Sequence, residues 1–271
     1  MLVNRMKAVA AAVLILSMNL TAACGNRLNS AVIAAGSTSV QPYAEVLAEE
    51  YALLYPERAV DVQGGGSSAG IAAAESGTAD IGMSSRGLNE HEEALWSVEI
   101  AKDGLAIIIN PGNPISNLTL DQVRDVYSAA INNWSDLGGG NAKIHVIARE
   151  EGSGTRSAFE NLVMDSVEIT PKAIVQDSNG AVMQLVSNDP NSIGFISLGL
   201  LNQTQSVKAL RLDGVTATKE NIMNGSYSLY RPFLFVTKNQ PEGDVKQFID
   251  FTLSAQGQQC LINEGLIPNS N

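Results

Sequence analysis

The chain has too little cysteine, histidine and positive charge for several common functional classes. Its 271 residues contain two cysteines and two histidines, which excludes a disulfide framework and argues against a zinc site built from these ligands. Lysine and arginine number 17 against 28 aspartates and glutamates, giving a net charge of −11. General nucleic-acid binding needs a basic face, so this charge argues against a nucleic-acid partner. We expect no resident metal or cofactor.

The N-terminus is typical of an export signal. A short basic region precedes the apolar run 8–20, and small residues follow it up to Cys24. This run is shorter than the ~20 residues that a membrane-spanning helix needs. We expect 1–23 to be removed and Cys24, as in a bacterial lipobox, to carry a lipid at the start of a tether, 24–29. The lipobox leucine stands one position earlier than usual, so cleavage without lipid is the alternative.

The rest of the chain alternates strand and helix patterns. Short apolar runs with flanking glycine or proline predict strands at 31–35, 59–63, 79–82, 104–109, 143–148, 193–196 and 230–236. Helical periodicity occurs at 40–54, 68–76, 119–128, 155–164, 180–187, 218–224 and 243–264. This alternation predicts an α/β fold with mostly parallel strands.

Two extended segments look like crossings between domains. They lie at 110–114 and at Arg231-Pro232. A chain that leaves one domain and later returns would form two lobes joined by two hinge strands, with a ligand cleft between the lobes. We therefore expect lobe one to contain 30–109 and 232–271, and lobe two to contain 110–231.

Four turns rich in glycine and hydroxyl residues separate predicted strands from predicted helices. They are GSTS (36–39), GGGSSAG (64–70), DIGMSSR (80–86) and REEGSGTR (149–156). Each helix start offers free backbone N–H groups and the positive end of a helix dipole, which suit an oxyanion. Parallel strands bring such turns to one edge of a sheet. The four turns together therefore predict an anion site.

Each turn alone has a simpler explanation. Serine and threonine before a helix are most often N-caps, and glycine after a strand most often marks a turn. Arg86 and Arg149 favour the functional interpretation, because a guanidinium can grip an oxyanion through two hydrogen bonds. The alternative for each arginine is a surface ion pair with Asp80, Glu150 or Glu151.

In combination these segments resemble the phosphate-binding receptors of bacterial phosphate ABC transporters, in the type II periplasmic-binding-protein family. The motifs are GSTSVQP, GGGSSAG, DIGMSSR, REEGSGTR followed by Phe159, NSIGFISLG and YRPFLFV. The resemblance covers the chain from about residue 30 to its end. It implies a two-lobed, monomeric, non-catalytic receptor that binds inorganic phosphate and delivers it to a membrane permease. Such a receptor works outside the cytoplasm, anchored to the outer side of the cell membrane or periplasmic.

The resemblance also implies which residues touch phosphate. Position-by-position matching gives Thr38, Ser39, Ser67, Arg149, Ser153, Gly154 and Thr155. To these we add Ser37, Ser85 and Arg86 from the same turns. Asn179 and Gly180, in front of a later helix, are either further contacts or plain N-cap residues. Glu151 falls where the family has an acidic residue that pairs with the arginine corresponding to Arg149.

One position departs from the family pattern. Ser85, followed by Arg86, stands where family members carry a buried aspartate that accepts the proton of phosphate. That carboxylate also repels fully ionised sulfate, so its absence removes a known source of discrimination. Glu150, Asp177 or an uncharged oxygen could accept the proton instead, or Arg86 could give the site a second arginine and a preference for the dianion. A receptor for sulfate or molybdate is therefore the nearest alternative.

A serine hydrolase is the alternative from another class. Segment 66–70 matches G-x-S-x-G, with Ser68 as its nucleophile, between a strand and a helix. A hydrolase needs a histidine later in the chain, and the two available ones fit poorly. His91 lies in an acidic stretch, and His145 alternates within a predicted strand. We therefore expect a binding protein, not an enzyme.

Overall fold

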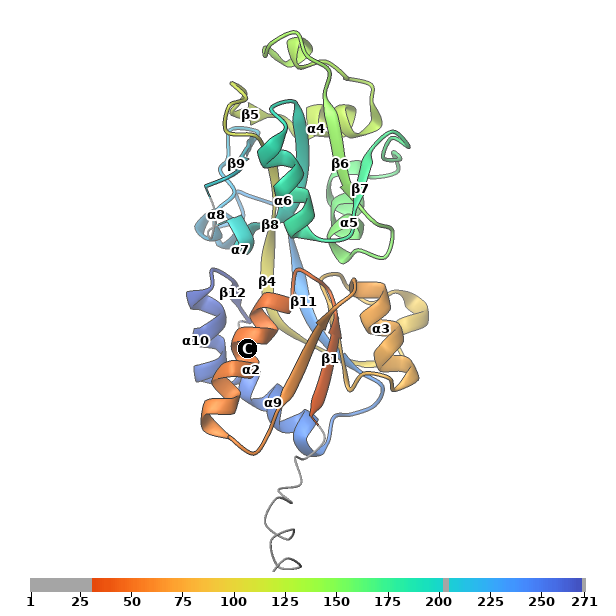
Figure 1. The fold of residues 1–271 in the computed structure, drawn as a ribbon, viewed down its shortest axis with the longest axis vertical. Helices are drawn as coiled ribbons and strands as arrows, with labels where there is room; N and C mark the ends of the chain where they lie inside the picture. The colour runs from red at the N-terminus through yellow and green to blue at the C-terminus, as the bar shows by residue number, and fades with distance from the viewer. Residues whose placement is uncertain (1–30, 202–204, 270–271) are drawn as a thin grey trace, which may run out of the picture. The chain divides into compact units, whose positions relative to one another are not determined.

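The computed structural model describes residues 31–201 and 205–269, which form an α/β fold (Figure 1). The predicted export signal and Cys24 lie outside the described residues. The main strands are β1 (Val32–Gly36), β2 (Val60–Gly64), β3 (Ile81–Ser84), β4 (Trp96–Ile109), β6 (His145–Arg149), β7 (Ile174–Gln176), β8 (Ser192–Ser197) and β11 (Tyr230–Thr237). They join in the order β2-β1-β3-β11-β4-β8-β6-β7. The short strands are β5 (Asn117–Leu118), β9 (Lys208–Ala209), β10 (Arg211–Leu212) and β12 (Ile267–Pro268).

Helices alternate with the strands. They are α2 (Gln41–Leu54), α3 (Ser67–Ser76), α4 (Leu120–Ser128), α5 (Gly154–Phe159), α6 (Asn179–Asn188), α7 (Leu198–Leu201), α8 (Lys219–Met223), α9 (Gly243–Leu253) and α10 (Ala255–Asn263). Of these, α2, α3, α5 and α6 link strands that run parallel. Helix α2 connects β1 to β2, and α3 connects β2 to β3 across β1. Right-handed crossovers in opposite directions place α2 and α3 on opposite faces of the sheet (Figure 1).

The described residues contain two large hydrophobic cores and a small third cluster of Ile71, Leu234 and Val236. One large core contains apolar side chains from β1, β3, α2, α9, β11 and the first part of β4. The other contains side chains from β4, β6, β8, α4 and α6. We call the part 31–104 with 230–269 the first half, and the part 105–229 the second half. Each half thus carries its own core, as two lobes would.

Strands β4 and β11 connect the two halves. Strand β4 pairs with β11 as far as Gly104, and from Leu105 onward it pairs with β8 instead. Strand β11 begins at Tyr230, opposite Gly104. The chain therefore passes from the first half to the second between Gly104 and Leu105, before the expected crossing at 110–114. It returns to the first half at Tyr230, next to the expected crossing at Arg231-Pro232. We propose these positions as the limits of the lobes.

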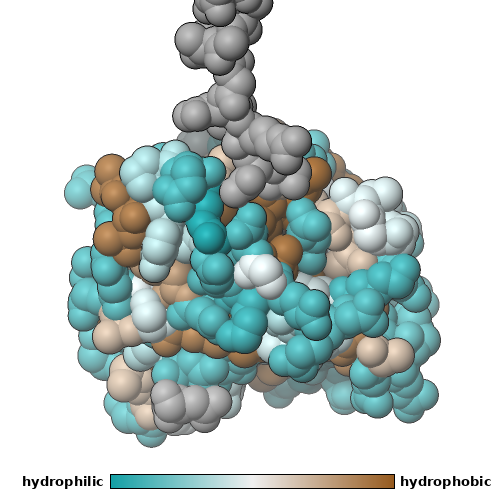
Figure 2. All heavy atoms as spheres, turned by 90° about the horizontal axis from the view of Figure 1, so that it is seen from below, coloured by the Kyte–Doolittle hydropathy of each residue, from teal (hydrophilic) through white to brown (hydrophobic). Residues whose placement is uncertain are grey.

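The described surface shows no sign of a membrane-spanning segment. Among 31–201 and 205–269, every helix is too short or too polar to cross a bilayer. Figure 2 shows one end of the molecule, where polar residues cover most of the face and apolar residues form small separate groups.

Helix α3 packs on bare backbone, which gives a test of the fold. A Cβ atom on Gly70 would lie 2.5 Å from the Ala35 carbonyl oxygen and 2.6 Å from the Gly36 Cα. Backbone atoms cannot turn aside as a side chain can, so we expect Gly70→Ala to lower the free energy of unfolding by about 3 kcal/mol. Urea denaturation would measure this loss. Gly140→Ala, with open space around it, should change stability by less than about 0.5 kcal/mol.

Candidate functional site

The first three turns meet through their hydroxyl groups. Ser37 Oγ donates to Ser85 Oγ at 2.9 Å, and Ser67 Oγ accepts a hydrogen bond from the Ser85 backbone N–H at 3.0 Å. All three serines are buried. The turn after β1, the start of α3 and the turn after β3 therefore form one polar cluster, as the parallel strand order predicts.

Glycine lets the first two turns approach each other. Gly36 has φ +139°, which L-residues with side chains rarely adopt, and a Cβ there would lie 2.3 Å from the Met83 carbonyl oxygen. The Gly36 carbonyl accepts from the backbone N–H groups of Gly65 and Gly66 at 2.7 and 3.0 Å. This backbone contact holds the second turn against the first and places Ser67 beside Ser85.

The fourth turn brings the second half against this cluster. Thr155, on α5, makes a hydroxyl–hydroxyl hydrogen bond of 2.8 Å with Ser39. The Ser68 backbone N–H donates to the Gly152 carbonyl at 3.1 Å. The side chain of Asn179, at the start of α6, donates to Ser39 Oγ at 2.9 Å. Ser39 is therefore a meeting point of hydroxyl and amide groups from both halves.

Two other predicted contacts have local roles in this arrangement. Ser153 is buried, and its Oγ accepts from the Arg156 backbone N–H as an N-cap of α5. Gly154 lies directly against the Ser67 and Ser85 side chains. Gly180 is exposed, with open space around its Cα, so the structure does not bring it to the cluster.

Arg149 reaches the cluster from the end of β6. Its side chain is 1% exposed, and its Nε and Nη2 donate to the two carboxylate oxygens of Glu150 at 2.9 and 2.8 Å. Nη2 also donates to the Asp177 carbonyl at 2.9 Å and to Thr38 Oγ1 at 3.3 Å. Nη1 is buried and has no hydrogen-bond partner within the described residues. A buried guanidinium thus keeps one free donor next to the first turn.

The acidic partner of Arg149 differs from the predicted one. Glu150, the next residue, holds the guanidinium, whereas Glu151 is exposed. The prediction that Glu151 pairs with Arg149 is therefore wrong. Strand β6 ends at Arg149, and Glu151 already lies in the following turn with its side chain exposed, so Glu150 is the glutamate that reaches the guanidinium. Because Glu150 is engaged as an ion-pair partner, it is a poor substitute for a proton acceptor.

Arg86 is turned toward Glu92. Its Nη1 and Nη2 donate to the two carboxylate oxygens at 2.7 and 2.8 Å, and they also reach the Gly87 carbonyl and Ser68 Oγ. Hydrogen bonds from Arg86 lower the pKa of the Glu92 carboxyl. Arg86 is therefore engaged in an ion pair, but this pair is buried and not at the surface as the alternative expected. Its partner is a glutamate other than the neighbours considered from sequence.

A buried charge pair beside Ser39 escaped the sequence analysis. Arg231 and Asp103 are 2% and 1% exposed and lie directly opposite each other on β11 and β4. Arg231 Nη2 donates to Asp103 Oδ2 and to Ser39 Oγ, both at 3.1 Å. Nε and Nη1 of Arg231 have no partner in the described part of the chain. The signal in the sequence is a lone charge, Arg231, inside the apolar run YRPFLFV.

Burial shifts the ionisation of this pair. Desolvation raises the pKa of the Asp103 carboxyl, and the charge of Arg231 opposes this rise. Desolvation likewise lowers the pKa of the Arg231 guanidinium, and Asp103 opposes that change. Asp103 Oδ1 also accepts from the Gly199 N–H at 3.3 Å. Asp103 thus contacts both halves.

Ser68 lacks the surroundings of a hydrolase nucleophile. It is exposed, and its Oγ accepts a hydrogen bond from Arg86. His91 is 80% exposed and lies near Glu92. His145 stands at the start of β6, away from the end that carries Arg149, and its Nδ1 contacts Asp189 at 2.6 Å. Within the described residues, neither histidine is hydrogen-bonded to Ser68.

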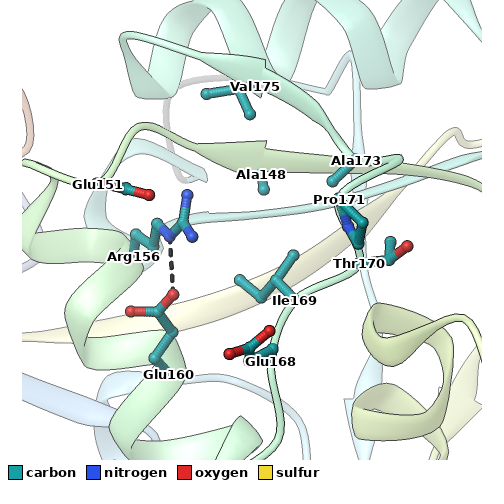
Figure 3. A pocket seen from close by; sticks show the side chains of 10 residues that line it. All are labelled: Ala148, Glu151, Arg156, Glu160, Glu168, Ile169, Thr170, Pro171, Ala173 and Val175. Carbon is teal, nitrogen blue, oxygen red and sulfur yellow. Dashed lines mark hydrogen bonds and ion pairs between the residues drawn. The ribbon is translucent and has the colours of Figure 1, made fainter.

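A cavity of about 500 Å³ lies near the fourth turn but has a different chemistry (Figure 3). Three carboxylates and one guanidinium line it, from Glu151, Arg156, Glu160 and Glu168, beside an apolar wall that includes Ile169 and Val175. Arg156 is already paired with Glu160 at 2.8 Å. This acidic lining does not suit an anion. Nor do the described residues contain a cluster of three His, Cys, Asp or Glu side chains suited to a metal ion.

The site around Ser39 can hold an oxyanion through directed donors. It combines hydroxyl groups from both halves, an amide and two buried guanidinium groups with free nitrogens. Each guanidinium already has its own carboxylate, so the local charge is close to balanced. Hydrogen bonds in such a dry site are stronger than in water. Binding would therefore rest on donor geometry and little on long-range attraction.

Comparison with known proteins places this arrangement in context. A model described as PBP superfamily domain matches residues 22–256. The phosphate-binding protein PstS of Borreliella burgdorferi is 31% identical, over 97% of this chain and 99% of that protein. PstS of Bacillus subtilis is 28% identical, over 93% of this chain and 90% of that protein.

Solved structures agree with these relatives. A substrate-binding protein from Clostridium perfringens, crystallised with bound phosphate, is 42% identical with a TM-score of 0.85, and the match covers 89% of this chain and 100% of that one. An ABC-type phosphate transport receptor from Vibrio cholerae is 39% identical with a TM-score of 0.73, over the same shares of the two chains.

Proposed function

The chain belongs to the PBP superfamily, and from this premise we propose that it is an extracytoplasmic receptor that binds inorganic phosphate for an ABC transporter. One observation of the site carries the proposal. Arg149 Nη1 is buried without a partner among the described residues, beside hydroxyl groups that both halves supply. A tetrahedral oxyanion would satisfy that nitrogen and hydrogen-bond to the surrounding hydroxyls. The phosphate-binding names of the relatives support phosphate as the oxyanion.

The proposed mechanism is a hinge motion about β4 and β11. Ligand contacts come from the first half through Thr38, Ser39 and Ser67, and from the second half through Arg149 and Thr155. A ligand that touches both halves binds the closed form better than the open form and shifts the equilibrium toward closure. The closed receptor is the form that a permease would recognise.

The cellular setting follows from the N-terminus and the transport role. We propose that 1–23 direct export and that Cys24 carries a lipid, which tethers a monomeric receptor to the outer side of the cell membrane. A single lipid chain binds a membrane only weakly, so a diacylated cysteine would be needed for a stable anchor. The permease partner is proposed from the transport names of the relatives.

Calorimetric titration of the exported, phosphate-stripped chain tests the proposal. We expect one phosphate site and a much weaker response to sulfate and molybdate, at about pH 5.5 and pH 8.5, which bracket the second ionisation near 6 of a phosphoryl group. Added salt should change affinity little, because local donors and not net charge hold the anion. Comparable sulfate binding would support a receptor for another oxyanion. No heat with any of the three anions would reject the proposed function.

A further inference from the structure

The Arg231–Asp103 pair lies where the two connecting strands run side by side. Arg231 is on β11 and Asp103 is on β4, in directly opposed register. Gly104 follows immediately, and from Leu105 the strand β4 pairs within the second half. The pair therefore lies on the two strands that connect the halves, next to the polar cluster.

Arg231 has donors that the described residues leave unused. Its Nε and Nη1 are buried without hydrogen-bond partners, although buried polar groups in proteins are nearly always paired. Arg86 provides a contrast within the same half. Both terminal nitrogens of Arg86 have partners, chiefly the two oxygens of Glu92. The free buried nitrogens on Arg231 are therefore available to an acceptor from outside the chain.

The guanidinium that carries these free nitrogens lies beside the predicted anion contacts. Arg231 Nη2 donates to Ser39 Oγ at 3.1 Å, and the same oxygen contacts Thr155 Oγ1 and Asn179 Nδ2. Arg149 bonds to Thr38, the residue before Ser39, so the two guanidinium groups approach one turn. The charge of Arg149 also contributes to lowering the pKa of Arg231, which fits two cations in proximity.

We propose that Arg231 is a second anion-binding arginine of the cleft and that Asp103 is the positioning residue that holds it. This inference rests on the proposed function and adds a specificity determinant to the same site. Two guanidinium groups balanced by Glu150 and Asp103 make a site with no net charge. Such a site favours an anion that can keep a proton, as phosphate can and sulfate cannot. Asp103 thereby contributes to the discrimination of phosphate from sulfate, which Ser85, lacking a carboxylate, cannot provide.

Two substitutions test the two roles by calorimetry on the exported full chain. Arg231→Lys keeps the charge but removes the planar fork, so phosphate affinity should fall about ten- to hundredfold. Asp103→Asn leaves an uncompensated cation in the site, so the ratio of sulfate to phosphate affinity should rise about tenfold. Arg58→Lys is the matched control, because Arg58 pairs with Asp244 in the same half and has no contact with Ser39. It should bind both anions as the wild type does.

The possible outcomes separate this inference from the proposed function. If the wild type binds no phosphate, the proposed function fails and this inference falls with it. If the wild type binds phosphate and Arg231→Lys binds it equally well, only the role of Arg231 is rejected. An unchanged sulfate-to-phosphate ratio in Asp103→Asn rejects the role of Asp103.

A crystal structure of the wild type with phosphate covers the case in which a variant fails to fold. We expect Nε or Nη1 of Arg231 within about 3.2 Å of a phosphate oxygen. Phosphate bound with both nitrogens more than about 4 Å away would overturn the inference, whatever the variants do.

Discussion

Arg149→Ala is expected to lower phosphate affinity by about thirty- to several-thousandfold. The substitution removes the free Nη1 donor and the charge that faces the hydroxyl cluster, and it leaves the Glu150 carboxylate without its partner beside the anion. Truncating one member of a hydrogen-bonded charge pair at a binding site costs about 2–5 kcal/mol, which corresponds to a thirty- to several-thousandfold change in affinity. Calorimetry on the exported chain would measure this loss.

Arg124→Ala is the control for Arg149. Arg124 lies on α4 in the same half and bonds to the Val163 carbonyl and to Asp121, away from the four turns. It should leave phosphate affinity within about threefold of the wild type. Wild-type affinity in a folded Arg149→Ala protein would contradict the position proposed for the anion.

Gly154→Ala is expected to weaken phosphate binding about ten- to hundredfold by obstructing closure. A Cβ atom at this position would lie 2.3 Å from Ser67 Oγ and 2.6 Å from Ser85 Oγ, both on the opposite half. Overpacking of this kind costs about 1–3 kcal/mol, and here the halves can escape the clash by staying apart. The cost therefore falls on the closed state and appears as lost affinity. Urea denaturation of the ligand-free protein should change little.

Gly152→Ala is the matched control in the same turn. Its Cβ would lie 3.8 Å from the Ser68 Cβ, an ordinary contact, so binding should stay within about threefold of the wild type. Small-angle scattering with and without phosphate would follow closure directly. If Gly154→Ala contracts on adding phosphate and binds like the wild type, the clash does not limit closure.

The α/β class and most elements could be predicted because their signals are local. Strands such as β1, β3 and β8 appear as short apolar runs, and their helices as 3.6-residue periodicity. The segment 243–264 was wrongly predicted as one helix. It forms α9 and α10, because Ser254 Oγ caps the second helix by accepting from the Gly257 N–H.

Strand β4 shows where local signals end. The run 104–109 was predicted, but the strand begins at Trp96, and its first part is only partly buried and carries polar residues. That part is a strand because it pairs with β11, more than 120 residues later. Only the folded sheet brings the two segments together, so no window of sequence contains the signal.

The candidate site likewise has features that the sequence predicts and features that depend on the folded structure. Hydroxyl groups in turns before helices are a local pattern, and the structure brings Ser37, Ser39, Ser67, Ser85 and Thr155 together. Whether Glu150 or Glu151 pairs with Arg149 depends on which carboxylate faces the guanidinium in the folded turn. The sequence pattern does not distinguish these two neighbours. The pairing of Arg231 with Asp103 depends on strand register across the whole second half.

The position of β11 between β3 and β4 bears on the order in which the chain acquires its structure. The first half starts at the N-terminus, yet its central strand is among the last segments made. Until 230–237 is made, β3 and the first part of β4 lack the strand that lies between them in the folded sheet. The second half, 105–229, already holds nearly all of its own core by then. We therefore expect the inserted half to fold first and the cleft to be completed last.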